Sequence, residues 1–157
     1  MDGACIYSYI TLIGTVSITE DGEGRITGVY LPSSNLPCMD DCETDALAEA
    51  GAQINEYFSG KRKKFMLDLS YDGTEFKVKV LDALQEIPFG ETRTYAEVAE
   101  MAGSPRAYRA VGTACAENPI PIIIPCPRVV PSSGGLGSSA GGSILKKKLL
   151  DGERSLL

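Results

Sequence analysis

Residues 94–116, TYAEVAEMAGSPRAYRAVGTACA, decide the fold of the second half of this chain. Thr94 is followed three residues later by Glu97, which is the spacing of a capping box at the start of a helix. The apolar positions that follow predict a short helix through Met101, and Gly103 is placed to stop it. One compact helix is therefore expected at this point.

A second helix is expected to follow at once. Ser104 suits the N-cap position and Pro105 the first helical position, so we expect a helix that reaches about Ala116. Arg106 and Arg109 would then lie on neighbouring faces near its start. Two helices joined by a tight glycine-containing turn are typical of a helix-turn-helix DNA-binding unit, although helix pairs in bundles share the pattern.

The next segment, residues 118–130 (NPIPIIIPCPRVV), contains three consecutive isoleucines between prolines. Such a run predicts a short buried strand, since the prolines exclude a helix. Cys126 follows this strand, and Pro127 favours an extended backbone at the cysteine. Position alone favours an inert core cysteine over a reactive one. Residues 131–142 then predict a glycine- and serine-rich loop, followed by a final helix through Lys146 to Asp151.

The first half of the chain has a different pattern. Cys5–Leu31 is rich in β-branched residues, and Asp21–Gly24 interrupts it with turn residues, so strands with at least one hairpin are expected. Glu43–Phe58 has the apolar spacing of an amphipathic helix. Thr74 is a plausible N-cap for a further helix. We therefore expect an N-terminal α/β domain over residues 1–73 and a second domain over 74–157.

Composition limits the chemistry that the chain can perform. It has 157 residues, 43% of them hydrophobic, which suits one ordinary domain or two small ones and excludes general disorder. It has no histidine, which removes imidazole general bases, histidine zinc sites and Ser-His or Cys-His nucleophile pairs. Because no signal-like segment occupies the first twelve residues, we expect a cytoplasmic protein.

Charge and cysteine content add two further expectations. Residues 1–75 hold 5 Lys and Arg against 13 Asp and Glu, a net of −8, whereas residues 76–157 hold 10 against 8, a net of +2. This asymmetry is a weak hint of a polyanion-facing second half. Five cysteines leave at least one free thiol. Cys38 and Cys42 could bind a metal or form a disulfide, but loop coincidence is the preferred interpretation, and no cofactor is expected.

Residues 89–95 (FGETRTY), 103–112 (GSPRAYRAVG) and 118–130 follow one another in an order that resembles the O6-alkylguanine-DNA alkyltransferase family. Members of this family are also called methylated-DNA–protein-cysteine methyltransferases. The resemblance covers about residues 74–153. It implies an α/β fold in which a small ribonuclease H-like sheet with a helix precedes a mainly helical winged-helix or helix-turn-helix domain.

The resemblance also implies a function and a reactive residue. Family members flip an O6-alkylated guanine out of duplex DNA and transfer the alkyl group irreversibly to a cysteine, which corresponds here to Cys126. O4-alkylthymine is a second candidate substrate. Asn118 corresponds to the asparagine that braces the active-site turn, and Glu153 to the buried family glutamate. A thiolate suits this substitution because it is a soft, strong nucleophile.

The same resemblance assigns the DNA-contacting residues. Arg109 corresponds to the arginine that fills the space of the extruded base, and Tyr95 to the tyrosine that crowds the 3′ phosphate. Arg106 and Arg128 are expected as further DNA-binding cations. The expected partner is double-stranded DNA that contains O6-alkylguanine, bound by a monomer without a membrane. Extruding the base costs a few kcal/mol, and less for a badly paired damaged base.

Three residues are expected to form the alkylguanine pocket. The carbonyl of Val129 would accept a hydrogen bond from the guanine amine, and the amide of Ala140 would lie near guanine O6. Ser139 stands where the family places a tyrosine. The chain also has Pro127 where the family motif Pro-Cys-His-Arg has the histidine that takes the thiol proton.

These departures leave three interpretations open. The first is an active alkyltransferase whose thiolate is stabilised by Arg128, by a water linked to Glu153, or by helix dipoles. The second is a protein similar to the alkyltransferase-like proteins, which bind the lesion without accepting the group. The third is a homologue with another task, such as plain DNA binding or redox sensing. Losing a positioned general base typically costs about 10²–10⁴-fold in rate, which a stoichiometric reaction tolerates.

Overall fold

The computed structural model describes residues 3–133 and 142–155, which form two compact units. One unit comprises Met1–Tyr71 together with Pro119–Ile123, and the other comprises Asp72–Asn118 together with Ile124–Leu157. The main junction therefore lies at residues 71 and 72, close to the expected boundary. The short segment 119–123, which the sequence placed in the second domain, clusters with the first unit instead.

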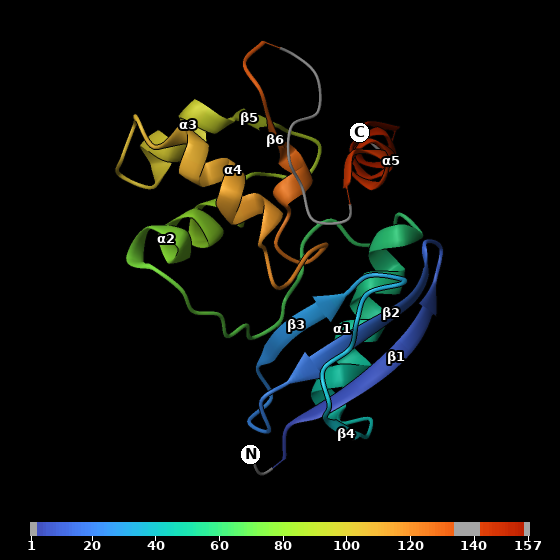
Figure 1. The fold of residues 1–157 in the computed structure, drawn as a ribbon. Helices are drawn as coiled ribbons and strands as arrows, with labels where there is room; N and C mark the ends of the chain where they lie inside the picture. The colour runs from blue at the N-terminus through green and yellow to red at the C-terminus, as the bar shows by residue number, and fades with distance from the viewer. Residues whose placement is uncertain (1–2, 134–141, 156–157) are drawn as a thin grey trace. The chain divides into compact units, whose positions relative to one another are not determined.

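The first unit is a four-stranded sheet with one helix (Figure 1). Its strand order is β3-β2-β1-β4, in which β1, β2 and β3 are antiparallel and β4 runs parallel to β1. The elements are β1 (Cys5–Thr11), β2 (Gly14–Glu20), β3 (Ile26–Tyr30), β4 (Asp40–Asp41) and α1 (Asp45–Phe58). The expected strands, hairpin and helix are all present.

Local chemistry explains these elements. The Asp21 carboxylate accepts hydrogen bonds from the amides of Glu23 and Arg25, which closes the β2–β3 turn. Thr44 caps α1, because its side chain accepts from the Leu47 amide. In α1, a Cβ at Gly51 would lie only 2.9 Å from the Tyr9 ring, so glycine permits the close approach of the helix to β1.

A disulfide joins Cys5 in β1 to Cys42, just after β4. Cys38 is exposed and is not in a disulfide. The possible Cys38–Cys42 disulfide is therefore wrong: Cys42 lies beside β1, because β4 pairs with that strand. Within residues 3–133 and 142–155, no group of three or more acidic or cysteine side chains is arranged to hold a metal ion.

The second unit is mainly helical (Figure 1). It contains α2 (Glu75–Leu84), α3 (Tyr95–Met101), α4 (Tyr108–Ala116) and α5 (Gly142–Ser155). Thr74 caps α2 as expected, and the reciprocal capping box of Thr94 and Glu97 opens α3. The final helix is longer than the expected Lys146–Asp151. Three short elements complete the unit, namely β5 (Arg93–Thr94), the 3₁₀ helix η1 (Cys126–Arg128) and β6 (Val129–Val130), which pairs parallel with β5.

The start of the second DNA-facing helix differs from the expectation. The amide of Ser104 donates to the Ala99 carbonyl at 2.9 Å, so Ser104 belongs to the C-terminal cap of α3 and does not open α4. A turn closed by the Ala107 amide and the Ser104 carbonyl follows, and α4 begins only at Tyr108. The expected helix start at Pro105 is therefore wrong.

The isoleucine segment also differs from the expectation. Ile122, Ile123 and Ile124 are buried, but they form a turn rather than a strand, and Ile122 has a positive φ of 75°. Such a φ is rare for a β-branched residue and is held here by burial between prolines. Cys126 lies in η1, so the extended backbone expected before Pro127 is also wrong.

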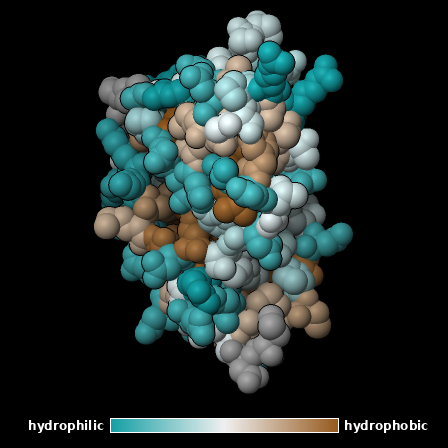
Figure 2. Space-filling view, turned by 90° about the vertical axis from the view of Figure 1, so that its left-hand side faces the viewer, coloured by the Kyte–Doolittle hydropathy of each residue, from teal (hydrophilic) through white to brown (hydrophobic). Residues whose placement is uncertain are grey.

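Each unit buries its own apolar side chains. In the second unit, Val80, Leu84, Val98 and Val111 are fully buried where α2, α3 and α4 pack together. Figure 2 shows hydrophilic residues interspersed with hydrophobic ones on one face of the molecule. Across the described part of the chain, every helix is too short or too polar to cross a membrane.

Candidate active site around Cys126

Cys126 lies at the start of η1 with 1% of its surface exposed, and it is not in a disulfide. Its amide donates to the Ile124 carbonyl at 2.9 Å, and its carbonyl accepts from the Val129 amide. The backbone on both sides of the thiol is therefore fixed by local hydrogen bonds. A second thiol, Cys115, is fully buried in α4, as expected from its place in that helix.

Asn118 holds the turn that leads to the thiol. Its buried side-chain amide donates to the Ile124 carbonyl at 3.0 Å. This bond joins the two ends of segment 119–123, where the chain leaves the second unit and returns to it. The geometry is that expected of a bracing asparagine, and it fixes the backbone two residues before Cys126.

Arg128 and Glu153 form a buried ion pair. Arg128 Nε and Nη2 each lie 3.0 Å from a Glu153 carboxylate oxygen, and Arg128 Nη1 donates to the Ile87 carbonyl at 2.7 Å. Glu153 also accepts from the Gly90 amide at 3.1 Å, and the Phe89 ring lies 5.7 Å from the guanidinium carbon. The pair thus joins η1, α5 and the segment before β5.

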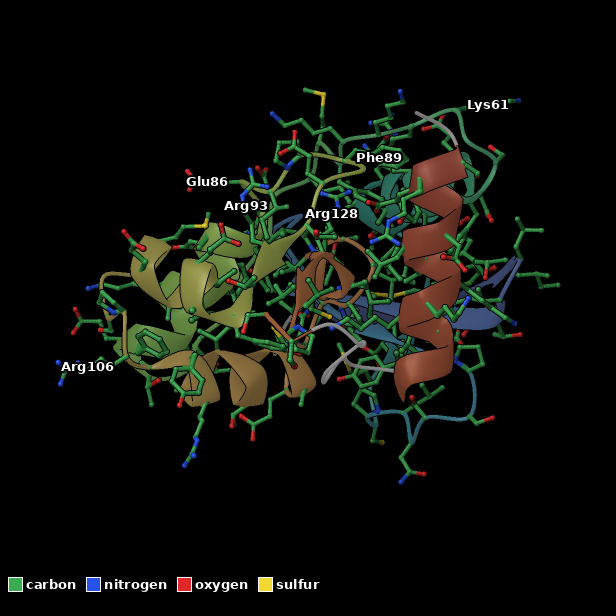
Figure 3. The ribbon with its side chains drawn as sticks, turned by 90° about the horizontal axis from the view of Figure 1, so that it is seen from above. Lys61, Glu86, Phe89, Arg93, Arg106 and Arg128 are labelled. Atoms are coloured by element: carbon green, nitrogen blue, oxygen red, sulfur yellow. A yellow bond between two sulfur atoms is a disulfide. The ribbon has the colours of Figure 1, made fainter. Side chains whose placement is uncertain are left out.

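This pairing contradicts two expectations about Arg128. The side chain is 7% exposed and all three of its nitrogens donate inside the protein, so it is not placed to contact DNA. Figure 3 shows Arg128 among other side chains, whereas Arg106 extends from the edge of the unit. Its charge is also neutralised by Glu153, which leaves it poorly suited to stabilise a thiolate.

Sequence reasoning missed Lys146, which is the largest fully buried side chain of the protein. Its Nζ donates to the Val129 carbonyl and, at 3.4 Å, to the Tyr95 hydroxyl. Burial lowers the pKa of Lys146, while the Cys115 and Cys126 thiols act in the opposite direction. A helical spacing could have revealed it, because Lys146 shares one face of α5 with Leu149, Leu150 and Glu153.

We refer to Cys115, Cys126, Arg128, Lys146 and Glu153 as the buried cluster. Burial raises the pKa of the Cys115 thiol to about 12, the Cys126 charge adds to this effect, and Lys146 opposes it. The two thiols and the lysine therefore interact electrostatically. The expected pocket residue Val129 is buried beside them, and its carbonyl already binds Lys146. Ser139 and Ala140 lie outside the described residues.

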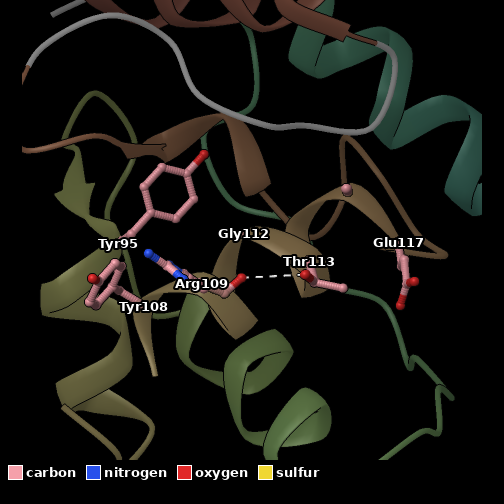
Figure 4. Close-up of a pocket in the computed structure, with 7 residues that line it drawn as sticks. Tyr95, Tyr108, Arg109, Gly112, Thr113 and Glu117 are labelled. Carbon is pink, nitrogen blue, oxygen red and sulfur yellow. Dashed lines mark hydrogen bonds between the residues drawn. The ribbon is translucent and has the colours of Figure 1, made fainter. Parts of the chain in front are cut away.

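The exposed side of α4 carries the other predicted site residues. A pocket of about 450 Å³ is lined by residues of α3 and α4 and the residue after α4, namely Tyr95, Tyr108, Arg109, Gly112, Thr113, Ala116 and Glu117 (Figure 4). Arg109 is exposed in the first turn of α4, where its carbonyl accepts from the Thr113 hydroxyl at 3.3 Å. Arg106 is exposed in the preceding turn, and so it does not share a helix with Arg109.

The structure thus combines a pair of helices of the helix-turn-helix type with a buried cysteine that is fixed on a braced turn. The exposed arginines near the start of α4 suit contact with a polyanion, and the thiol is the strongest nucleophile available without histidine. These features define a DNA-binding unit that carries its own nucleophile.

Comparison with known proteins places the chain in one family. Residues 75–155 match the family profile described as "6-O-methylguanine DNA methyltransferase, DNA binding domain". The constitutive methylated-DNA–protein-cysteine methyltransferase of Bacillus subtilis is 43% identical over 152 residues, which is 92% of each chain. The methylated-DNA–protein-cysteine methyltransferase of Methanosarcina barkeri is 53% identical over 109 residues, which is 69% of each chain.

Solved structures agree with this result. The Mycobacterium tuberculosis O6-methylguanine methyltransferase has a TM-score of 0.88 at 35% identity, with 98% of this chain and 94% of that chain covered. A structure of the same organism's protein in complex with DNA has a TM-score of 0.89 at 36% identity, covering 97% of this chain and 94% of the other. The chain belongs to the 6-O-methylguanine DNA methyltransferase family. The family assignment made from the sequence is confirmed.

Proposed function

We propose that the protein repairs alkylated DNA by direct reversal, with Cys126 as the acceptor of the alkyl group. The observation that carries this proposal is the braced turn, which fixes an unoxidised cysteine one helical element away from the DNA-binding helix pair. The Cys126 sulfur attacks the alkyl carbon, a carbon–sulfur bond forms, and the carbon–oxygen bond breaks. The bonding electrons leave with guanine O6, and the thioether that remains makes the reaction a single turnover.

The exposed pocket supports the DNA side of the proposal. Arg109 is the residue expected to enter the duplex, and its position in the first turn of α4 leaves it free of the core. Tyr95 lines the same pocket and is expected to crowd the 3′ phosphate. The preferred substrate is a duplex with O6-alkylguanine, with O4-alkylthymine as a second candidate.

The buried carbonyls support the recognition of the base. The Val129 carbonyl accepts from Lys146, but a carbonyl oxygen has two lone pairs, so it can also accept from a guanine amine. The Cys126 carbonyl is the second expected acceptor. Asn118 acts on this site only as a positioning residue, through its bond to the Ile124 carbonyl. Glu153 has the same kind of role, because it anchors Arg128 and the Gly90 amide.

A second candidate function is lesion binding without transfer. The observation that favours it is Pro127, which stands where the family motif has its histidine and which also removes a backbone N–H beside the thiol. Under this alternative the chain would hold alkylated DNA while Cys126 stays unmodified.

The two functions are separated by intact-protein mass spectrometry after incubation with duplex DNA that contains O6-methylguanine. Transfer predicts a gain of one methyl group on the Cys126 peptide, complete loss of this gain in Cys126→Ser, and an unchanged gain in Cys38→Ser. An electrophoretic preference for lesion DNA with no gain in mass would support the binding function instead and overturn the first proposal.

The finer assignments from the sequence stay predictions. They are the ribonuclease H-like character of the first unit, the winged-helix character of the second, a monomeric state, and a cytoplasmic location. Of these, the monomeric state is checked most directly, by light scattering with and without DNA.

A further inference from the structure

A buried lysine lies at the centre of the cluster that contains the thiols. Lys146 has no exposed surface, and the aromatic ring of Tyr95 lies 5.5 Å from its Nζ. Its hydrogen bonds go to a backbone carbonyl and a phenol, both of which are neutral. A buried ammonium is costly unless an anion is near, so these neutral partners leave much of the cost of its charge uncompensated.

The groups that face this amine come from several elements. They are the Tyr95 phenol from α3, the Cys115 thiol from α4 and the Cys126 thiol from η1. Both thiols favour the protonated form of Lys146, and the lysine in turn favours the ionised form of Cys115. A thiolate at Cys126 is an anion of the kind that a buried ammonium requires. Val129, which binds Nζ, is only three residues from Cys126 and follows directly on η1.

The other groups that could activate the thiol are engaged elsewhere. The guanidinium of Arg128 is held by Glu153 and by the Ile87 carbonyl. The carboxylate of Glu153 is held by Arg128 and by the Gly90 amide. Histidine is absent from the sequence. Of the charged members of the buried cluster, Lys146 alone is not paired with an opposite formal charge in the described structure.

We propose that Cys126 ionises against Lys146, with one proton shared between Sγ and Nζ and carried by Nζ in the reactive form of the site. This inference rests on the proposed function and names the group that replaces the missing histidine. In the cluster the thiol–amine and thiolate–ammonium forms have the same number of protons, so they exchange without a net charge entering the interior. The second form presents the nucleophile.

Protons and electrons balance through the transfer. The thiol proton moves to Nζ, and the thiolate electron pair forms the new bond to the alkyl carbon. The electron pair of the broken carbon–oxygen bond leaves with guanine, which takes a proton from water at N1. The hydroxide that results takes the proton from Nζ, since the alkylated sulfur no longer carries a charge. Lys146 therefore ends as an amine beside a thioether.

The test measures thiol reactivity without DNA. In a Cys38→Ser background, iodoacetamide modification of the Cys126 peptide is followed by mass spectrometry between pH 5 and pH 10. The matched pair of variants is Lys146→Met and Lys148→Met, which change a buried and an exposed lysine of the same helix. We expect Lys146→Met to slow the reaction at pH 7 at least tenfold and to raise its pH midpoint by at least about one unit. Lys148→Met should match the parent protein.

A pH profile that is the same with and without Lys146 would overturn the inference. A second measurement uses the unmutated chain, in case Lys146→Met does not fold. Alkylation of Cys126 removes the anionic partner, so the pH at which Lys146 loses its proton should fall, as read from the ¹⁵N chemical shift of Nζ. An unchanged value would also overturn the inference.

The design keeps the two proposals distinct. If the iodoacetamide profile depends on Lys146 but lesion DNA transfers no methyl group, the proposed function fails and the thiol–amine pair stands. If methyl transfer occurs with a profile that ignores Lys146, the repair function stands and the pair fails.

Discussion

The α3–α4 helix pair and the buried cluster lie in the same unit, but different interactions hold them. The helix pair is organised by contacts between near neighbours in sequence, such as the Thr94–Glu97 capping box and the Ser104–Ala99 bond. The buried cluster joins residues that are far apart, such as Gly90 and Glu153, which are separated by 63 positions. Changes in the helix pair should therefore alter DNA handling, whereas changes in the cluster should alter folding or thiol chemistry.

The sharpest test of this contrast is Glu153→Ala. The change leaves Arg128 as a buried charge without its carboxylate, which typically costs about 3–5 kcal/mol of unfolding free energy. Urea denaturation at pH 7 measures this loss. As a control, Asp151→Ala removes an exposed carboxylate that pairs with Lys147 on the same helix, and we expect less than about 1 kcal/mol. Similar losses in both variants would refute a structural role for the buried pair.

The difference between the regions also explains what the sequence could predict. Capping residues and glycine stops act within a few positions, so the Thr74 and Thr94 helix starts were correct. The start of α4 was missed because Ser104 was already bonded to Ala99, a competition that the spacing of Ser and Pro does not show.

Within the site, the resemblance identified Cys126 and the buried nature of Glu153, but it misplaced Arg128. Its error was physical, because an arginine beside an exposed-looking motif is read as a surface cation until its carboxylate partner is known. Lys146 was missed for the same reason. Its burial depends on contacts with Val129 and Tyr95, which lie 17 and 51 positions away.

A smaller effect is expected from Cys115, which is a member of the buried cluster. Burial raises the pKa of its thiol from an ordinary value of 9.0 to about 12. Between these values the folded protein keeps a proton that the unfolded chain has lost. Stability is therefore unaffected below pH 9 and falls above it, by about 1.4 kcal/mol per pH unit.

Cys115→Ala should remove this dependence. The difference in unfolding free energy between the parent protein and Cys115→Ala, measured from pH 7 to pH 10.5, should stay constant to pH 9 and then decrease. Cys38→Ala changes an exposed thiol and should give a difference that does not depend on pH. A flat difference for both variants would mean that the Cys115 thiol titrates normally and that the cluster is more accessible to water than its burial indicates.

The smallest effect on stability is expected from Arg109→Ala in the exposed helix pair. Arg109 is exposed and lies outside the core, so the unfolding free energy should change by no more than about 0.5 kcal/mol. Methyl transfer from a duplex lesion should nevertheless slow much more than transfer from free O6-methylguanine, because only the duplex requires a side chain to fill the space of the extruded base. Arg106→Ala, which changes an exposed arginine in the turn before α4, is the matched comparison. Its loss should be smaller and similar to that of any single phosphate contact, with a salt slope lower by about 0.9. Equal losses on duplex and free base in Arg109→Ala would place this residue with the thiol chemistry rather than with the DNA, and would break the contrast between the two regions.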